Sequence, residues 1–265
     1  MCGFSIVRSA PLRYCGGRAA LASEVTMSKQ FVFVHGMSHG AWCWAAVQAR
    51  LERAGHATLA VDLPGHGRRA HEWRRASVAA YARAVADAIA LAGFSRAIVV
   101  GHSMAGVVIP KVAELVPARV AHLVFLAAVV LSDGGTLLAT QIPAPARPLL
   151  RGLARAGGGA VQYPAVVEHA RWMSGLAPGD PRVVEALTHL TPQPFRPWAE
   201  RVPMRRFYAL AVPRTYIRCL RDAAVVPAQA AEYAARLGVR PVDLDSDHGP
   251  MLSRPDELAR LLAKV

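Results

Sequence analysis

The sequence has few of the features that mark membrane proteins, metalloproteins or disulfide-rich proteins. No apolar run reaches the roughly 18 residues that a membrane-spanning helix needs. The 265 residues include only four cysteines, which form neither a C-x-x-C pair nor a metal-ligand cluster. Such a pattern suits a reducing compartment. We therefore expect a cytoplasmic protein that holds no metal.

Lysine is also rare, so the formal net charge of +13 comes almost entirely from arginine. The arginines are scattered, and no basic run is longer than pairs such as Arg68-Arg69 and Arg205-Arg206. Basic proteins bind nucleic acid or anionic membranes when their positive charges are clustered. The scatter instead indicates an arginine-rich background composition, and we expect neither nucleic acid nor a membrane as a partner.

Short apolar runs alternate with helical patterns along most of the chain. This alternation predicts an α/β fold with a mostly parallel sheet of about six strands and helices on both faces. Strands are expected at 30–34, 56–61, 96–100, 121–127, 214–219 and 239–244. Helices are expected at 41–54, 77–91, 107–116, 227–237 and 254–264, and Ser77 is expected to cap the second of these.

The alternation stops between residues 132 and 210, where prolines are frequent and Gly157-Gly158-Gly159 interrupts any helix. This segment is predicted to be a helical cap or lid inserted into a core formed by 27–131 and 211–265. Residues 1–26 lack periodicity, and we expect a disordered or spurious extension there, with a targeting peptide as the less favoured alternative.

A candidate nucleophile lies in Gly101-His102-Ser103-Met104-Ala105-Gly106, between an apolar run and a helical pattern. In a G-x-S-x-G turn that joins a strand to a helix, the serine is held in a strained conformation at the carboxyl edge of the sheet. The pattern therefore predicts that Ser103 is a nucleophile. The side chain of His102 should point the other way, and we interpret it as structural.

A serine hydroxyl needs a base, and the base needs an acid that orients it. His248 follows the last predicted strand, so it should reach the sheet edge where Ser103 lies. Asp222 follows the preceding strand and is the preferred acid. The rivals are Asp243, Asp245 and Asp247, whereas Asp62 is interpreted as a turn residue.

An oxyanion hole requires two backbone N–H groups that point at the developing negative charge. The residue after the nucleophile, Met104, should supply one of them. Met37, in the loop after the first strand, should supply the other, and Gly36 allows that loop to approach the substrate closely.

These motifs together resemble the α/β-hydrolase superfamily. The stretch from Phe31 to Trp44 (FVFVHGMSHGAWCW) more narrowly resembles plant methylesterases, hydroxynitrile lyases and bacterial carboxylesterases such as pyrethroid hydrolases. The resembling lyases carry Thr where Gly36 stands and Lys where Gly249 stands, so the resemblance favours hydrolysis over C–C cleavage. Serine at 103, where aspartate would stand in dehalogenases and epoxide hydrolases, argues against those branches.

The resemblance implies a cofactor-free serine carboxylesterase that acts on small-to-medium hydrophobic esters through an acyl-enzyme. A lyase, lactonase or tailoring enzyme with the same triad, or a non-catalytic receptor, remains an alternative, and a homodimer is left open. One of Trp42 and Trp44 is expected in the core. The substrate pocket is expected to include Gly36, His39, Trp172, Trp198, Phe195 and Phe207, with Tyr163 and Met173 as further candidates.

Overall fold

The computed structural model describes residues 28–265, so the predicted extension 1–26 lies outside the described part of the chain. Six strands form one sheet in the order β2-β1-β3-β4-β7-β8, and every neighbouring pair is parallel. The strands are β1 Gln30–Val34, β2 Ala57–Val61, β3 Ala97–His102, β4 Val120–Leu126, β7 Arg214–Cys219 and β8 Val242–Leu244. The predicted α/β fold and strand number are confirmed.

Alternating residues of the strands fill two separate cores, one on each face of the sheet. In β1, Val32 and Val34 face one core, whereas Phe31 and Phe33 face the other. Helices α2 Val78–Leu91, α3 Ile109–Leu115 and α10 Pro227–Arg236 cover the first core. Helices α1 Ala45–Arg53 and α12 Pro255–Ala263 cover the second.

Most predicted elements lie within a few residues of their observed bounds. Ser77 caps α2 by accepting a hydrogen bond from the backbone N–H of Ala80 at 3.1 Å. The last strand was expected from residue 239 and begins at Val242 instead. Pro241 has no N–H to donate to the sheet, which explains the late start. Trp44 is the tryptophan of the pair that packs in the core, stacked on Phe33 with ring centroids 4.8 Å apart.

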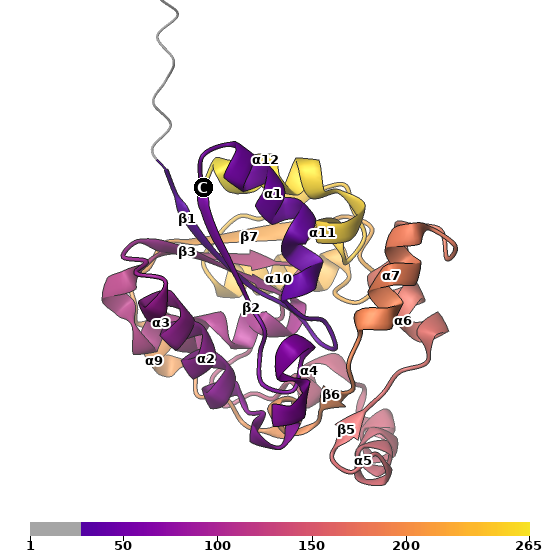
Figure 1. Ribbon diagram of the computed structural model, residues 1–265. Coiled ribbons are helices and arrows are strands. Elements are labelled where there is room, and N and C mark those ends of the chain that lie inside the picture. Colours follow the sequence, from indigo (N-terminus) through magenta and orange to yellow (C-terminus); the bar gives the residue numbers. More distant parts are fainter. Residues whose placement is uncertain (1–27) are drawn as a thin grey trace, which may run out of the picture.

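The segment predicted as a cap leaves the sheet after β4 and returns at β7. It contains α4 Leu137–Gln141, η5 Ala144–Ala146, α5 Arg147–Ala156, β5 Ala160–Val161, α6 Ala165–Trp172, α7 Pro181–His189, β6 Gln193–Pro194, α8 Arg196–Ala199 and α9 Arg205–Tyr208. Strands β5 and β6 form a separate antiparallel pair. In the view of Figure 1, α6 and α7 lie to the right of the sheet and α5 lies below them. None of the helices in the described residues has the length and apolar character needed to cross a membrane.

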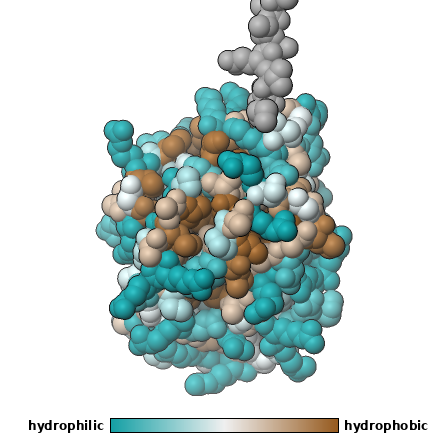
Figure 2. Space-filling model, turned by 90° about the vertical axis from the view of Figure 1, so that its left-hand side faces the viewer, coloured by the Kyte–Doolittle hydropathy of each residue, from teal (hydrophilic) through white to brown (hydrophobic). Residues whose placement is uncertain are grey.

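The opposite side of the molecule carries α2, α3 and α9 (Figure 1). Figure 2 shows this face, where hydrophobic residues gather in the middle and hydrophilic residues surround them. A hollow between α2 and α3 is lined by Val78, Ala82 and Leu115. Leu115 is about half exposed at 48%. A half-exposed apolar residue is ordinary for a globular protein.

Candidate active site

Ser103 lies in the strained turn that the sequence predicts, directly after β3. Its φ of +53° is in the left-handed region that residues other than glycine seldom adopt. The turn is tightly packed, because a Cβ on Gly106 would lie 2.3 Å from the carbonyl oxygen of Val129. A Cβ on Gly101 would lie 2.7 Å from Cγ2 of Ile109. Both glycines are therefore required by close approach of neighbouring backbone and side chains.

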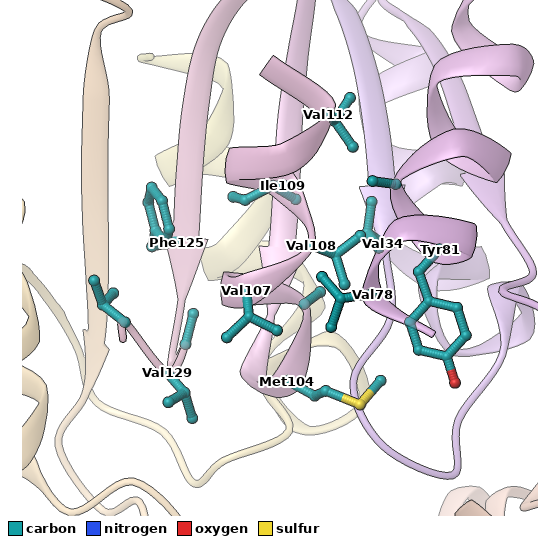
Figure 3. Packing of buried hydrophobic residues seen from close by; sticks show 14 of the residues in the cluster. Val34, Val78, Tyr81, Met104, Val107, Val108, Ile109, Val112, Phe125 and Val129 are labelled. Carbon is teal, nitrogen blue, oxygen red and sulfur yellow. The ribbon is translucent and has the colours of Figure 1, made fainter. Parts of the chain in front are cut away.

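Buried side chains hold the chain that follows Ser103 in place (Figure 3). A 3-10 turn, η3 Ser103–Val107, leads into α3. Val107, Val108 and Ile109 are fully buried in the first core, and Figure 3 shows them between Val34 and Phe125 of the neighbouring strands. The backbone that carries Ser103 is thus fixed by the packing of the core.

Ser103, the predicted base His248 and the predicted acid Asp222 form a continuous line of hydrogen bonds. Nε2 of His248 is 2.9 Å from Oγ of Ser103, and Nδ1 of His248 is 2.7 Å from Oδ2 of Asp222. The side chains of His248 and Asp222 are each only 1% exposed. The second carboxylate oxygen of Asp222 accepts hydrogen bonds from the backbone N–H groups of Ala224 and Val225 at 2.7 and 2.8 Å.

The rival carboxylates have other partners. Asp243 and Asp245 form ion pairs with Arg218 and Arg221 at the surface. Asp247 accepts hydrogen bonds from the backbone of Gly175 at 2.9 Å and from the hydroxyl of Ser253 at 2.5 Å. The tertiary structure thus selects one acid from a set that spacing alone leaves crowded.

Asp62 also has partners of its own and behaves as the turn residue that the sequence predicts. Its carboxylate accepts hydrogen bonds from the backbone N–H groups of Ala41 at 2.7 Å and Arg68 at 3.3 Å. It therefore joins the loop after β2 to the start of η1 Ala41–Trp44.

The side chain of His102 contacts the loop that carries His248, and the ring centroids of the two histidines lie 4.7 Å apart. Its Nε2 is 2.8 Å from the carbonyl oxygen of His248. A carbonyl oxygen only accepts, so Nε2 of His102 carries the proton. Burial holds the pKa of His102 well below its ordinary value, and the ring is neutral. The contact fixes the loop that presents the imidazole of His248.

The two predicted oxyanion residues, Met37 and Met104, both line the cavity that contains Ser103. Met104 is the second residue of η3. The first N–H groups of a helical turn have no acceptor within that turn. The carbonyl of Met37 accepts hydrogen bonds from the backbone N–H and from Nδ1 of His39, both at 2.7 Å.

The cavity beside Ser103 has a volume of about 210 Å³, and most of its wall comes from the predicted cap. Trp172 and Trp198 line it as predicted, and so does Tyr163. Residues of the predicted cap that the sequence does not signal are Leu137, Gln141, Ile142, Ala146, Leu149, Leu150, Leu153, Val167 and Arg171. Short helices with irregular connections position them, so no spacing pattern in the sequence signals their place.

Two of the predicted aromatic pocket residues lie elsewhere. Phe207 is fully buried in the first core, where its ring packs against Phe125 with centroids 6.2 Å apart. Phe195 lines a shallow surface hollow together with Arg151 and Arg196. Both side chains pack against the first core of the sheet and not against the cavity.

Other predicted pocket residues lie just behind the cavity wall. His39 stacks on Trp42 with ring centroids 5.4 Å apart and meets Trp172 edge-on at 5.9 Å. Met173 is buried in the small core beneath Trp172. A Cβ on Gly36 would lie 3.0 Å from Cβ of Ser103, so glycine permits the close approach of its loop.

Within residues 28–265 there is no group of three or more histidine, cysteine, aspartate or glutamate side chains that could hold a metal ion.

The model of the alpha/beta hydrolase family matches residues 31–261, which is most of the chain. This chain belongs to that family.

Relatives of this chain include the group that the sequence resembles. Methylesterase 7 of Arabidopsis thaliana is 29% identical over 259 residues, covering 89% of this chain and 96% of that protein. A probable esterase of Oryza sativa, PIR7A, is 45% identical over 104 residues, but the match spans only 38% of this chain and 39% of the relative.

Among solved structures, an extracellular alpha/beta-hydrolase from a Paenibacillus species superposes with a TM-score of 0.81 at 24% identity. The superposition covers 89% of this chain and 98% of that one. At this identity the likeness supports the fold alone. Together, the family match and the methylesterase relatives confirm the predicted family and group.

Proposed function

We propose that this protein is a cofactor-free serine carboxylesterase. The observation that supports it most is the line from Oγ of Ser103 to His248 at 2.9 Å and on to Asp222 at 2.7 Å. Such a line makes a hydroxyl nucleophilic, because the imidazole takes its proton as the oxygen attacks. The methylesterase and esterase names of the relatives support the same chemistry.

Each member of the line has one task in this proposal. Ser103 attacks the ester carbonyl, and Nε2 of His248 takes the hydroxyl proton and then delivers it to the leaving alcohol. Asp222 holds the imidazole with the proton on Nδ1 and stabilises the imidazolium that forms. Water, deprotonated by His248, then releases the acid from the acyl-enzyme.

The negative charge on the carbonyl oxygen is stabilised by the backbone N–H groups of Met37 and Met104. Preorganised donors of this kind contribute strongly to acyl transfer, since the loss of one commonly lowers the rate by about 10² to 10³. Their place in the cavity beside Ser103 supports this assignment.

The substrate in this proposal is a hydrophobic ester of small to medium size. A cavity of about 210 Å³ with a wall of leucine, methionine and tryptophan supports this choice. The two cysteines in the described residues, Cys43 and Cys219, are buried free thiols. This state suits a reducing compartment, and we propose the cytoplasm on that ground.

Hydrolysis of p-nitrophenyl acetate, butyrate and octanoate by wild type and by Ser103→Ala tests the proposal. We expect the variant to lose at least about 10⁴-fold in kcat. Ser246→Ala is the matched control, because this serine is also buried in the site region but its hydroxyl bonds to the carbonyl of Asp247. Equal rates in wild type and Ser103→Ala, or failure of a fluorophosphonate to label Ser103, would refute the assignment.

A further inference from the structure

Two residues of the predicted cap, Thr191 and Gln193, form hydrogen bonds with the backbone of Ser38, which directly follows Met37. Oε1 of Gln193 accepts a hydrogen bond from the N–H of Ser38 at 3.1 Å. The N–H of Thr191 donates to the carbonyl of Ser38 at 2.9 Å, and its hydroxyl lies 3.3 Å from the same oxygen. These contacts join parts of the chain that are 153 and 155 residues apart.

Ser38 needs such support because its conformation is unfavourable by itself. Its φ is +58°, although it is not a glycine, and it is only 1% exposed. A left-handed residue of this kind costs of the order of 1 to 3 kcal/mol and persists only where its surroundings impose it. A buried N–H or carbonyl without a partner would add a further cost. Gln193 and Thr191 satisfy both groups of Ser38.

A chain of hydrogen bonds between side chains fixes the direction of the Thr191 hydroxyl. Nδ1 of His66 is 2.9 Å from this hydroxyl, and the hydroxyl of Tyr81 is 3.3 Å from Nε2 of His66. A single assignment of protons satisfies the chain. Tyr81 donates to His66, His66 donates from Nδ1 to Thr191, and Thr191 donates to the carbonyl of Ser38.

The consequence for Met37 follows from the planarity of peptide groups. The peptide that joins Met37 to Ser38 is held at its carbonyl by His39 and at its N–H by Gln193. The preceding peptide, which carries the N–H of Met37, is held at the carbonyl of Gly36 by Nδ1 of His35 at 2.7 Å. With these anchors in place, the N–H of Met37 has a fixed direction.

We propose that Gln193, assisted by Thr191, is a positioning residue for the oxyanion hole, through which the cap fixes the Met37 N–H that the proposed hydrolysis uses. The inference rests on the proposed function. According to this inference, the cap affects the rate of the chemical step in addition to forming the wall of the cavity. Gln193 is 2% exposed and does not line that cavity, so it acts through the loop and not on the substrate.

Gln193→Met tests this inference, because methionine has a similar length but cannot accept the hydrogen bond from Ser38. We expect kcat to fall by about 10- to 100-fold, since small misplacements of a catalytic donor have effects of this size. KM should change by less than about threefold, because the cavity wall is unchanged. Gln193→Glu keeps an oxygen at the same position and should recover part of kcat.

A second readout separates positioning from a general loosening of the cap. Sulfur is a poor hydrogen-bond acceptor, so an intact oxyanion hole favours an oxoester over the matching thionoester. This preference, and the affinity for a trifluoromethyl ketone that mimics the tetrahedral intermediate, should fall in Gln193→Met in parallel with kcat. Glu200→Met is the matched control, because Glu200 also accepts a hydrogen bond from a core backbone N–H, but that of Val78 and not one in the loop of Met37 and Ser38.

Unchanged kcat and oxoester preference in Gln193→Met, or equal losses in Glu200→Met, would overturn the inference while the esterase assignment stands. A wild type no faster than Ser103→Ala would instead overturn the proposed function, and this inference with it. If Gln193→Met does not fold, Thr191→Val carries the test. It removes the hydroxyl but keeps the backbone bond, so a smaller loss of kcat is expected, and no loss would contradict the inference.

Discussion

The sheet core and the segment 132–210 contribute to the site in different ways. The core supplies Ser103, Asp222 and His248 from loops that directly follow β3, β7 and β8, and their mutual contacts lie between 2.7 and 2.9 Å. The segment 132–210 supplies most of the cavity wall. In the proposed mechanism the reactive groups thus come from the loops of the sheet, and most of the wall of the substrate cavity comes from the insertion.

The two regions also differ in how completely they are packed. All four residues from Phe31 to Val34 are fully buried in the core. On α5, by contrast, Leu149 and Leu153 line the cavity while remaining 68% and 51% exposed. A region with an open apolar wall can change its lining at small cost in stability, whereas a close-packed core cannot. Substitutions in the core should therefore change the rate and the stability, whereas substitutions in the insertion should change the selectivity among substrates.

The largest effect is expected for Asp222→Asn in the core. The side-chain oxygen of asparagine can still accept the bonds from Ala224 and Val225, so the loop should keep its shape. Its amide, however, would face Nδ1 of His248 as a donor and impose the wrong tautomer. We expect kcat to fall by about 10⁴-fold with little change in the melting temperature.

The control for this variant is Asp247→Asn, because Asp247 is equally buried and lies beside His248 in sequence but contacts Gly175 of the insertion. It should lower the melting temperature or raise KM, and kcat should fall by less than about tenfold. A loss of kcat in Asp247→Asn as large as that in Asp222→Asn would show that the core does not act alone in orienting the base.

The second comparison uses one tryptophan from each region. Trp44→Ala removes a side chain that is fully buried against Phe33, and we expect it to destabilise the protein by about 3 to 5 kcal/mol. Trp198→Ala removes part of the cavity wall and should lower the free energy of unfolding by a smaller amount. The preference in kcat/KM should shift toward esters with longer acyl chains. Denaturant unfolding and a series of p-nitrophenyl esters measure both. Equal destabilisation by the two variants would contradict the difference in packing.

A third effect comes from Glu168 in α6, whose carboxylate is 1% exposed and whose two oxygens have no partner among residues 28–265. Burial raises its pKa from 4.5 to about 8. Between these values the unfolded chain releases a proton that the folded protein keeps, so stability falls as the pH rises from about 4.5 to about 8. The insertion should loosen over the same range.

Glu168→Gln removes this titration while keeping the shape of the side chain. We expect it to stabilise the protein by several kcal/mol at pH 8.5, since each pKa unit corresponds to about 1.4 kcal/mol, and to have little effect at pH 4. Thermal unfolding at the two pH values measures the difference. Glu185→Gln, at an exposed position of α7, should show no such dependence. Parallel curves for wild type and Glu168→Gln would refute the burial effect.

The smallest effects are expected at the surface, where the two regions should behave alike. Arg50 pairs with Asp256 between the core helices α1 and α12, and Arg182 pairs with Asp180 in the insertion. Exposed ion pairs contribute about 0 to 1 kcal/mol. Arg50→Gln and Arg182→Gln should each lower the free energy of unfolding by less than about 1 kcal/mol. A larger loss in only one of them would reveal a regional difference that packing does not explain.

The sequence by itself determined the α/β architecture, the strained turn at Ser103 and the prediction that His248 reaches the same sheet edge. These features are encoded locally, in apolar runs, in glycines that permit close approach and in residues that follow strands. Only the tertiary structure gave the rivals of Asp222 other partners, placed Phe207 in the core and joined Gln193 to Ser38. Each of these depends on contacts between distant segments, and the path of an irregular insertion leaves no periodic signal from which such contacts can be read.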